Sequence, residues 1–245
     1  MKWDWEVFLQ DTGGGQTYLE WIVSAWGWTL SVSLLALIVA IAIGAVVGTL
    51  RTMPRDRVLG RVAIRFGAAW VELFRNIPLL IQVFIWYHVI PTLIPVMKDL
   101  PGFVLVVFAL GFFTSARIAE QVRAGIQSLP RGQRAAAMAL GMTTAQSYRL
   151  VMLPLAFRII IPPLTSESMN IVKNSSVAFA VSVAELTFFS LQMQEETSRG
   201  IEVYLAVTTL YMITAFTINR VMAFIEQQVR VPGPGLIATG RTGGH

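Results

Sequence analysis

The chain of 245 residues contains no cysteine, which excludes disulfide bonds, thiolate metal sites and thiol catalysis. Its two histidines, His88 and His245, lie far apart in the sequence and form no recognisable metal-binding cluster. No phosphate loop of the form G-x-x-x-x-G-K-[ST] is present. No Ser/Lys nucleophile arrangement is visible either. We therefore expect no catalytic residue, no metal site and no cofactor in this chain.

Charged residues are also scarce. They make up 13% of the chain, whereas 55% of its residues are hydrophobic. A soluble domain carries roughly 25% charged residues, so the composition predicts a membrane protein. The length of the chain gives room for about five or six spans of about 20 residues. The net charge of +5 is typical of cytoplasmic loops that collect Lys and Arg, and does not indicate a nucleic-acid partner.

Long apolar runs divide the chain into an all-α helical bundle with about five spans. They cover about 21–50, 62–90, 103–125, 164–191 and 203–225. Residues 1–20 lack the positive start of a signal peptide and are expected to form an extracytoplasmic segment. Residues 21–230 are expected to form the membrane domain. The Gly- and Pro-rich residues 231–245 are expected to form a disordered cytoplasmic tail.

Arginines concentrate after the first, third and fifth runs, whereas the other two loops hold only Lys98 and Arg199. Because positive charge is retained in the cytoplasm, this asymmetry predicts an external N-terminus and a cytoplasmic C-terminus.

The cytoplasmic stretch 128–154 contains signals for two short helices. Pro130 precedes a run of helix formers from Arg131 to Leu140, and Gly141 is suited to end it. Thr143 and Gln146 match a capping box that begins a second helix, which Pro154 is expected to end.

The first of these helices is rich in small side chains that would let another backbone approach closely. Its candidate docking residues are Arg134, Ala135, Ala136, Ala137, Leu140 and Gly141. Either the alanine face docks on a partner, or alanine is present only for its helix propensity. The residues alone do not separate these alternatives.

The second run is interrupted by polar residues and a proline. Pro78 removes a helix hydrogen bond, and a broken helix exposes backbone groups that can contact a polar solute. The candidate pathway residues here are Arg75, Asn76, Pro78 and Gln82. Glu72, three residues before Arg75, is positioned to pair with it.

The fourth run carries Lys173, Asn174, Ser175 and Ser176 deep in an apolar stretch. A lysine at that depth requires a partner, a water-filled cavity or an anionic ligand, so these four residues are also pathway candidates. A structural Lys173–Glu pair is the alternative. Glu167 is expected to be solvated near the cytoplasmic end, and Glu185 to lie towards the outer end.

The third run ends with Arg117, Glu120 and Arg123, which share one helical face. We expect them to form a structural network at the cytoplasmic exit of the span.

The cytoplasmic stretch resembles the signature loop of importer permeases of the ATP-binding-cassette superfamily, with Ala136, Ala137, Gly141, Leu153 and Pro154 matching and Ala135 standing where an acid is usual. Three further motifs resemble the histidine/glutamine/glutamate branch. They are the segments 72–82, 119–133 and 173–176. The stretch 153–186 looks most like glutamate/aspartate permeases.

This resemblance implies a type I importer permease fold in a bacterial inner membrane. It also implies that the cytoplasmic helix couples the chain to ATPase subunits. The implied partners are a second permease subunit, two ATPase subunits that hold ATP and Mg²⁺, and an extracytoplasmic amino-acid-binding protein. The alternatives are a permease for glutamine, histidine or arginine, and an ion-coupled secondary transporter.

Overall fold

The computed structural model describes residues 3–55 and 58–229, so the predicted tail lies outside the described residues. Within these ranges every named element is a helix, of which η2 and η4 are π-helical and η1, η3 and η5 are 3₁₀-helical. In chain order they are η1 (Trp5–Leu9), α1 (Tyr18–Leu50), α2 (Val58–Asn76), α3 (Leu79–Phe84), η2 (Ile85–Val89), α4 (Ile90–Leu93), η3 (Pro95–Met97), α5 (Gly102–Gln127), α6 (Arg131–Ala139), α7 (Thr144–Ser147), η4 (Tyr148–Met152), α8 (Leu153–Asn174), η5 (Ser175–Val181), α9 (Leu186–Thr197) and α10 (Gly200–Val229).

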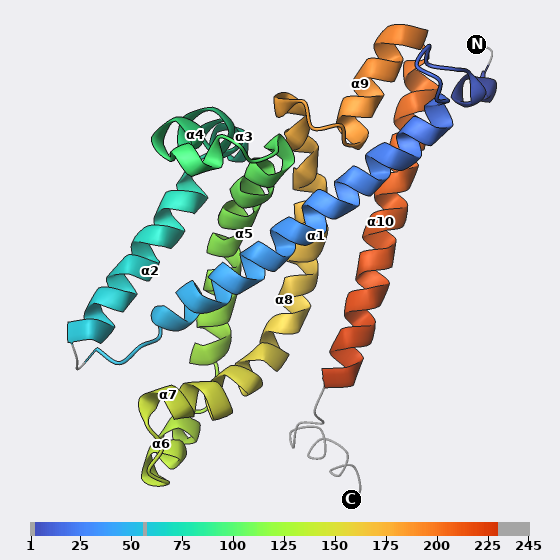
Figure 1. Ribbon diagram of the computed structural model, residues 1–245. Helices are drawn as coiled ribbons and strands as arrows, with labels where there is room; N and C mark the ends of the chain where they lie inside the picture. Colours follow the sequence, from blue (N-terminus) through green and yellow to red (C-terminus); the bar gives the residue numbers. More distant parts are fainter. Residues whose placement is uncertain (1–2, 56–57, 230–245) are drawn as a thin grey trace, which may run out of the picture.

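The predicted all-α membrane bundle is confirmed. Four helical stretches of the described chain are long and apolar enough to cross a bilayer: Tyr18–Leu50, Gly102–Gln127, Thr144–Val181 and Gly200–Val229. The predicted second span is instead a pair of helical segments, 58–76 and 79–93, bent by 104° at a short break. The described residues therefore contain four candidate spans, or five if the bent pair counts as one span. Figure 1 shows the long helices and the bend between α2 and α3.

Two glycines let α1 cross closely over α5. A Cβ added to Gly44 would lie 2.7 Å from the Cβ of Ile118, and one on Gly48 would lie 2.6 Å from the carbonyl oxygen of Ala119. Gly44 and Gly48 form a G-x-x-x-G pattern, which brings membrane helices into near-backbone contact. This pattern was a readable signal for the contact, although it was missed in the sequence.

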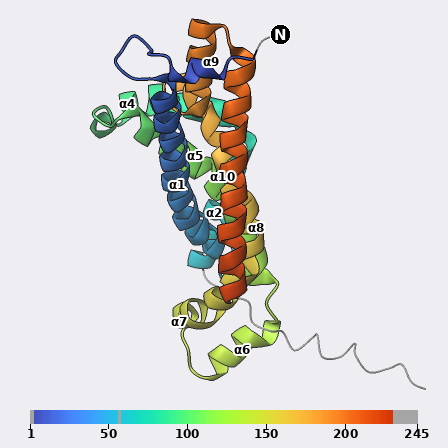
Figure 2. The ribbon, with the colours of Figure 1, turned by 90° about the vertical axis from the view of Figure 1, so that its right-hand side faces the viewer.

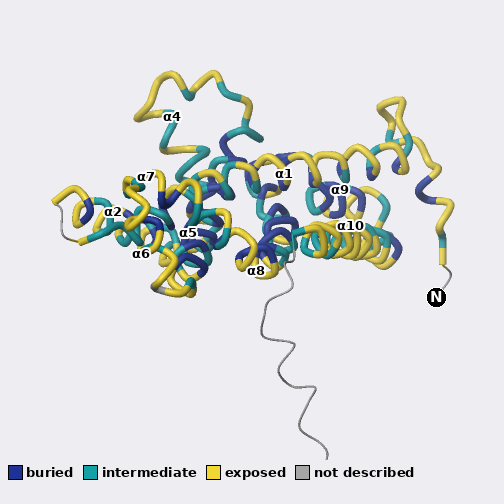
Figure 3. Tube along the Cα trace, turned by 90° about the horizontal axis from the view of Figure 1, so that it is seen from below, coloured by how far each residue is buried: buried dark blue, intermediate teal, exposed yellow. Residues whose placement is uncertain are grey.

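The helices differ in how far the chain itself covers them. In its most apolar window α5 is 61% buried, whereas α10 is only 22% buried. Figure 3 shows exposed residues along α10 and buried ones on α5 and α8. The centre of the bundle is therefore α5, and the outer faces of α1 and α10 are left for lipid or another subunit.

The fourth predicted span is wrong in its bounds. Pro154 does not end a helix but lies in the first turn of α8, directly after the π-helical turn η4. Pro162 and Pro163, the expected start, lie inside α8. The continuous helical stretch runs from 144 to 181, and the chain then turns at Ser182, whose φ is 58°.

A separate helix, α9, follows this turn. Glu185 is its N-cap, and its carboxylate accepts hydrogen bonds from the backbone N–H groups of Thr187 (2.9 Å) and Phe188 (3.0 Å). Glu185 is therefore a fully buried capping residue between two helices, and not a polar group within a span.

The short helices α6 and α7 lie at one end of the molecule, and α9 and the N-terminal segment lie at the other (Figure 2). The long helices connect these two ends.

Candidate functional site

The break between α2 and α3 is stabilised by Gln82. Its side-chain amide nitrogen donates to the carbonyl oxygens of Phe74 and Ile77, both at 2.9 Å. In an unbroken helix the Phe74 carbonyl would accept from residue 78, but Pro78 has no N–H. Gln82 therefore supplies a donor that the proline lacks, at a position where the predicted helix break is confirmed.

Gln82 itself is almost fully buried, at 3% exposure. Its side-chain oxygen Oε1 has no hydrogen-bond partner among the described residues. The side chain of this predicted pathway residue therefore hydrogen-bonds mainly to backbone carbonyls, and its Oε1 atom remains able to accept a further hydrogen bond.

A polar cavity of about 400 Å³ lies where α2, α5 and α8 converge. Its lining residues are Arg75, Phe113, Arg117, Glu120, Gln121 and Glu167. Arg75 was expected at such a site. Glu167, expected to be solvated, is 5% exposed instead, because α5 covers it with Arg117.

Both carboxylates of this cavity are paired with arginine. The Arg117 Nε atom lies 3.0 Å from a carboxylate oxygen of Glu167, and the Gln121 amide donates to the other oxygen at 3.3 Å. Glu120 pairs with Arg123 at 2.8 Å and also with Arg51 at the end of α1.

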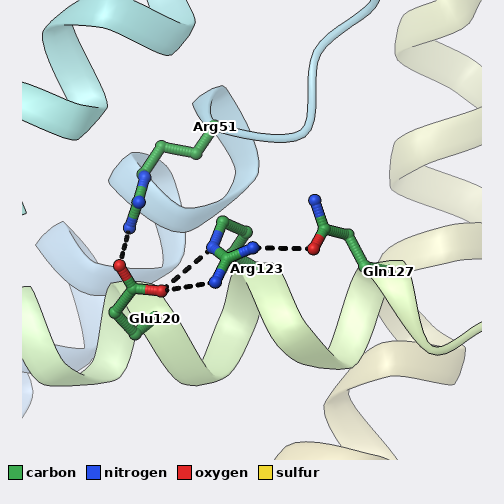
Figure 4. A network of polar contacts seen from close by, with 4 residues as sticks. All are labelled: Arg51, Glu120, Arg123 and Gln127. Atoms are coloured by element: carbon green, nitrogen blue, oxygen red, sulfur yellow. Dashed lines mark hydrogen bonds and ion pairs between the residues drawn. The ribbon is translucent and has the colours of Figure 1, made fainter.

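Figure 4 shows this second network, which continues from Arg123 to Gln127 at 2.7 Å. The predicted network on α5 is therefore present in part. Glu120 and Arg123 pair with each other, whereas Arg117 reaches across to α8.

Arg75 differs from the other arginines at this cavity. Within the described residues it forms no ion pair, and its predicted partner Glu72 forms none either. Both side chains are exposed. Because the cavity's carboxylates are already paired, Arg75 leaves uncompensated positive charge at its wall, which suits an anionic group.

The second predicted cluster lies at the end of α8. Lys173 is exposed and has no ion pair among the described residues, so the predicted Lys173–Glu alternative is not formed there. The hydroxyls of Ser175 and Ser176 donate to the carbonyls of Val172 and Lys173, each at 2.7 Å. These serines therefore stabilise the passage from α8 into η5.

The structure brings the two predicted pathway segments into contact, but away from the cavity at Arg75. The helix α3, which carries Gln82, packs against η5, which contains Ser175 and Ser176. Lys173 does not line the cavity at Arg75. Asn174 follows Glu167 by seven residues, about two turns, and so lies above it on nearly the same face of α8.

The predicted pair of short helices is confirmed in α6 and α7. Gly141 has φ +78° and its N–H donates to the carbonyl of Met138, while the N–H of Met142 donates to that of Ala137. This is a Schellman C-cap, for which a glycine is the favoured residue. Thr143 and Gln146 form the predicted capping box at the start of α7.

The candidate docking residues of α6 divide between two faces. Ala135, Ala136 and Leu140 are exposed, whereas Ala137 is buried. Tyr148 ties this end to the α1–α2 turn, because its hydroxyl donates to the carbonyl oxygen of Thr52 at 2.5 Å. A hollow of about 570 Å³ lies between the α1–α2 turn and the short helices α6 and α7, and it is lined in part by Arg134 and Met138.

This chain is similar in sequence and in structure to known membrane-transport proteins. Residues 40–231 match the family model described as "Binding-protein-dependent transport system inner membrane component". The chain is 41% identical to the glutamate/aspartate import permease protein GltJ of Escherichia coli (strain K12), over 95% of this chain and 97% of that protein.

It is also 34% identical to the probable glutamine ABC transporter permease protein GlnM of Bacillus subtilis (strain 168), over 80% of this chain and 89% of that one. Among solved structures, one titled "Crystal structure of an amino acid ABC transporter with histidines" matches with a TM-score of 0.74 and 28% identity. The match covers 93% of this chain and all of that one.

Proposed function

The chain belongs to the family of binding-protein-dependent transport system inner membrane components, and from this premise we propose that it is the permease subunit of an importer for glutamate and aspartate. The observation that carries this proposal is the 41% identity to GltJ, which extends over nearly the whole of both chains. An ion-coupled secondary transporter is disfavoured, because membership of this family implies dependence on a binding protein.

The charge of the cavity favours an acidic solute. Arg75 is the group best placed to meet a carboxylate, since Glu120 and Glu167 are each engaged by other arginines. Lys173 is a second cation on a pathway candidate segment and is exposed. We assign both as contacts for the negative charge of the solute during transfer, with Asn76, Asn174 and the backbone around Pro78 completing the pathway.

We propose that the N-terminus lies outside and the C-terminus in the cytoplasm. The basic turn after α1, with Arg51 and Arg55, lies at the same end of the molecule as α6 (Figure 1). Positive charge gathered at one end of a bundle marks its cytoplasmic side, here of a bacterial inner membrane.

The energy source is assigned to other chains. The exposed side of α6 at Ala135, Ala136 and Leu140 is the docking surface for an ATPase subunit, which holds ATP and Mg²⁺. Two such subunits, a second permease chain (related or identical) and an extracytoplasmic binding protein complete the assembly. ATPase closure then moves α6, and the spans switch between outward- and inward-facing states.

Uptake by the reconstituted complex tests the solute. Labelled glutamate should be taken up only with ATP and binding protein present, and unlabelled aspartate should compete better than glutamine, histidine or arginine. Preferential competition by one of those three would transfer the proposal to that amino acid. ATP-independent uptake driven by an ion gradient would refute the importer mechanism.

Arg75→Ala and Lys173→Ala test the pathway assignment. Both side chains are exposed, so the complex should still assemble, while uptake should fall at least tenfold. Arg75→Lys is the matched control, because it retains the charge and should keep a larger part of the activity. Wild-type rates in either alanine variant would remove that residue from the pathway.

Ala136→Glu tests the docking surface, because it places a bulky charge on an exposed position of α6. The ATPase should no longer co-purify. A control with Gln227→Glu, on an exposed position of α10, should leave co-purification unchanged. Retention of the ATPase by Ala136→Glu would refute docking at this face.

A further inference from the structure

The N-terminal helix η1 leaves its aromatic side uncovered. Trp3 and Trp5 stack with ring centroids 6.1 Å apart and an interplanar angle of 2°, and Trp5 also stacks on Phe8. Trp3, Trp5 and Leu9 are 58%, 50% and 66% exposed. A soluble surface rarely leaves such a continuous aromatic and aliphatic patch without a partner.

Other contacts hold this helix firmly against the bundle. Val7 and Phe8 are buried in a cluster with Tyr18 and Ile22 of α1 and with residues of α10. Asp4 pairs with Arg199 at 3.2 Å, and its backbone N–H donates to Glu202 at 3.1 Å. The charged group of Asp4 is thus directed towards protein, and the position of η1 is set by folding.

A groove of about 590 Å³ continues from this patch between α1 and α10. Its walls are almost entirely apolar and include Trp5, Leu9, Leu19, Val23, Leu205 and Thr209. Further along the same helices the exposed side chains are again apolar, among them Leu30 and Leu34 of α1 and Met212 and Phe216 of α10. The groove therefore opens, without a change in polarity, into the surfaces that face the bilayer core.

The length of α1 explains why an anchor is needed at this end. Its 33 residues extend about 50 Å, compared with a hydrocarbon core of about 30 Å. Such a helix must tilt strongly, and part of it must lie in the interface. Interfacial Trp and Tyr residues set the tilt of an over-long helix. Figure 1 shows α1 crossing the bundle obliquely, with η1 at its starting end.

We propose that residues Trp3–Leu9 form an interfacial anchor, with Trp3 and Trp5 in the headgroup region and a phospholipid acyl chain in the groove between α1 and α10. The bound partner is thus the lipid of the outer leaflet. This role is separate from solute transfer, since none of these residues lines the cavity at Arg75.

The absence of cysteine allows a direct test. A nitroxide is attached at Leu9→Cys in the complete complex, with the other subunits made cysteine-free, reconstituted in phosphatidylcholine/phosphatidylglycerol nanodiscs. The label should be more accessible to oxygen than to a water-soluble nickel chelate. The control is Gln16→Cys, in the exposed turn before α1, which should show the reverse order.

Two outcomes would overturn the proposal. The first is a Leu9 label with the same water accessibility as the Gln16 label. The second is a Leu9 label that becomes immobilised only when the binding protein is added, which would make the patch a protein-docking surface. Should the labelled complex fail to assemble, tryptophan quenching by brominated acyl chains supplies the test. The double variant Trp3→Leu with Trp5→Leu should then lower the fraction of tryptophan fluorescence that the brominated acyl chains quench. An unchanged fraction would also overturn the anchor.

Discussion

Two proline-containing regions of this protein behave in opposite ways. At Pro78 the chain turns by 104° between the helical segments 58–76 and 79–93. At Pro162 and Pro163, where two successive hydrogen-bond donors are missing, α8 continues without a break. The comparison shows that a proline permits a break, and that the packing around it decides whether a break occurs.

In the bent geometry at Pro78 the freed backbone carbonyls gain hydrogen-bond donors, and the following helix α3 gains a packing surface. Gln82 donates to the carbonyls of Phe74 and Ile77, and Val83 is fully buried in a core with Val106 and Val107 of α5. Bending therefore satisfies polar groups and also buries apolar area.

In α8 packing favours the opposite result. Ile160, Ile161 and Leu164 are buried, whereas Arg158, Ile159, Pro162 and Pro163 are all exposed. The carbonyls that lose donors belong to Arg158 and Ile159, on the outer face. A break here would separate buried side chains, so the helix retains its course despite the missing bonds.

Gln82→Leu should produce the largest loss of stability. It leaves two carbonyls without their donor, at about 1–3 kcal/mol each, so the free energy of unfolding should fall by about 2–6 kcal/mol. The midpoint of SDS-induced unfolding of the purified complex measures this change.

Gln121→Leu is the matched control for Gln82→Leu. Gln121 donates to Glu167, which keeps its pairing with Arg117, so a smaller shift is expected. Equal shifts in the two variants would show that Gln82 has no special role at the break.

Pro163→Ala should stabilise the protein by about 1–3 kcal/mol, because the helix already exists and alanine restores an N–H and removes a ring clash. The same unfolding midpoint reports the gain. A destabilised Pro163→Ala variant would contradict our account of α8.

Tyr148→Phe tests the hydrogen bond between the start of this helical stretch and the α1–α2 turn. It removes the hydrogen bond to the Thr52 carbonyl and should cost about 1 kcal/mol. If α6 transmits motion to α1 through this contact, ATP hydrolysis should also exceed uptake more than in the wild type. Unchanged stability and an unchanged ratio of hydrolysis to uptake would remove Tyr148 from that role.

Pro78→Ala should have the smallest effect, within about 1 kcal/mol, because the new N–H competes for a Phe74 carbonyl that Gln82 already satisfies. Thermal unfolding of Pro78→Ala beside Gln82→Leu separates the contributions of the two residues. A loss as large as that of Gln82→Leu would show that the proline ring itself maintains the bend.

Much of this protein was readable from local patterns. The apolar runs located the long helices, with α1 beginning at Tyr18 where 21 was expected and α10 extending over 200–229. The glycine stop at Gly141 and the capping box at Thr143 were predicted correctly, because both motifs are completed by residues within five positions of each other. The family followed from motifs at fixed spacing and was confirmed by comparison.

The partners of polar groups could not be read in the same way. Glu167 was expected in solvent but is covered by Arg117 from α5, fifty residues away. Glu185 was expected within a span but caps α9, and its oxygen also accepts from Tyr211 of α10. The Glu167–Arg117 and Glu185–Tyr211 contacts join side chains that are distant in the chain, so no local pattern encodes them.

The sequence by itself thus determined where the long apolar helices lie, how α6 ends and α7 begins, and to which family the chain belongs, since apolar runs, capping and motif spacing are local properties. Only the tertiary structure decided that Pro78 bends the chain while Pro162 and Pro163 do not, and that Arg75 remains without an acidic partner within the described residues. The physical reason is that a freed carbonyl or a charged side chain is stabilised by whatever group packing brings beside it, and that group comes from another helix or another turn.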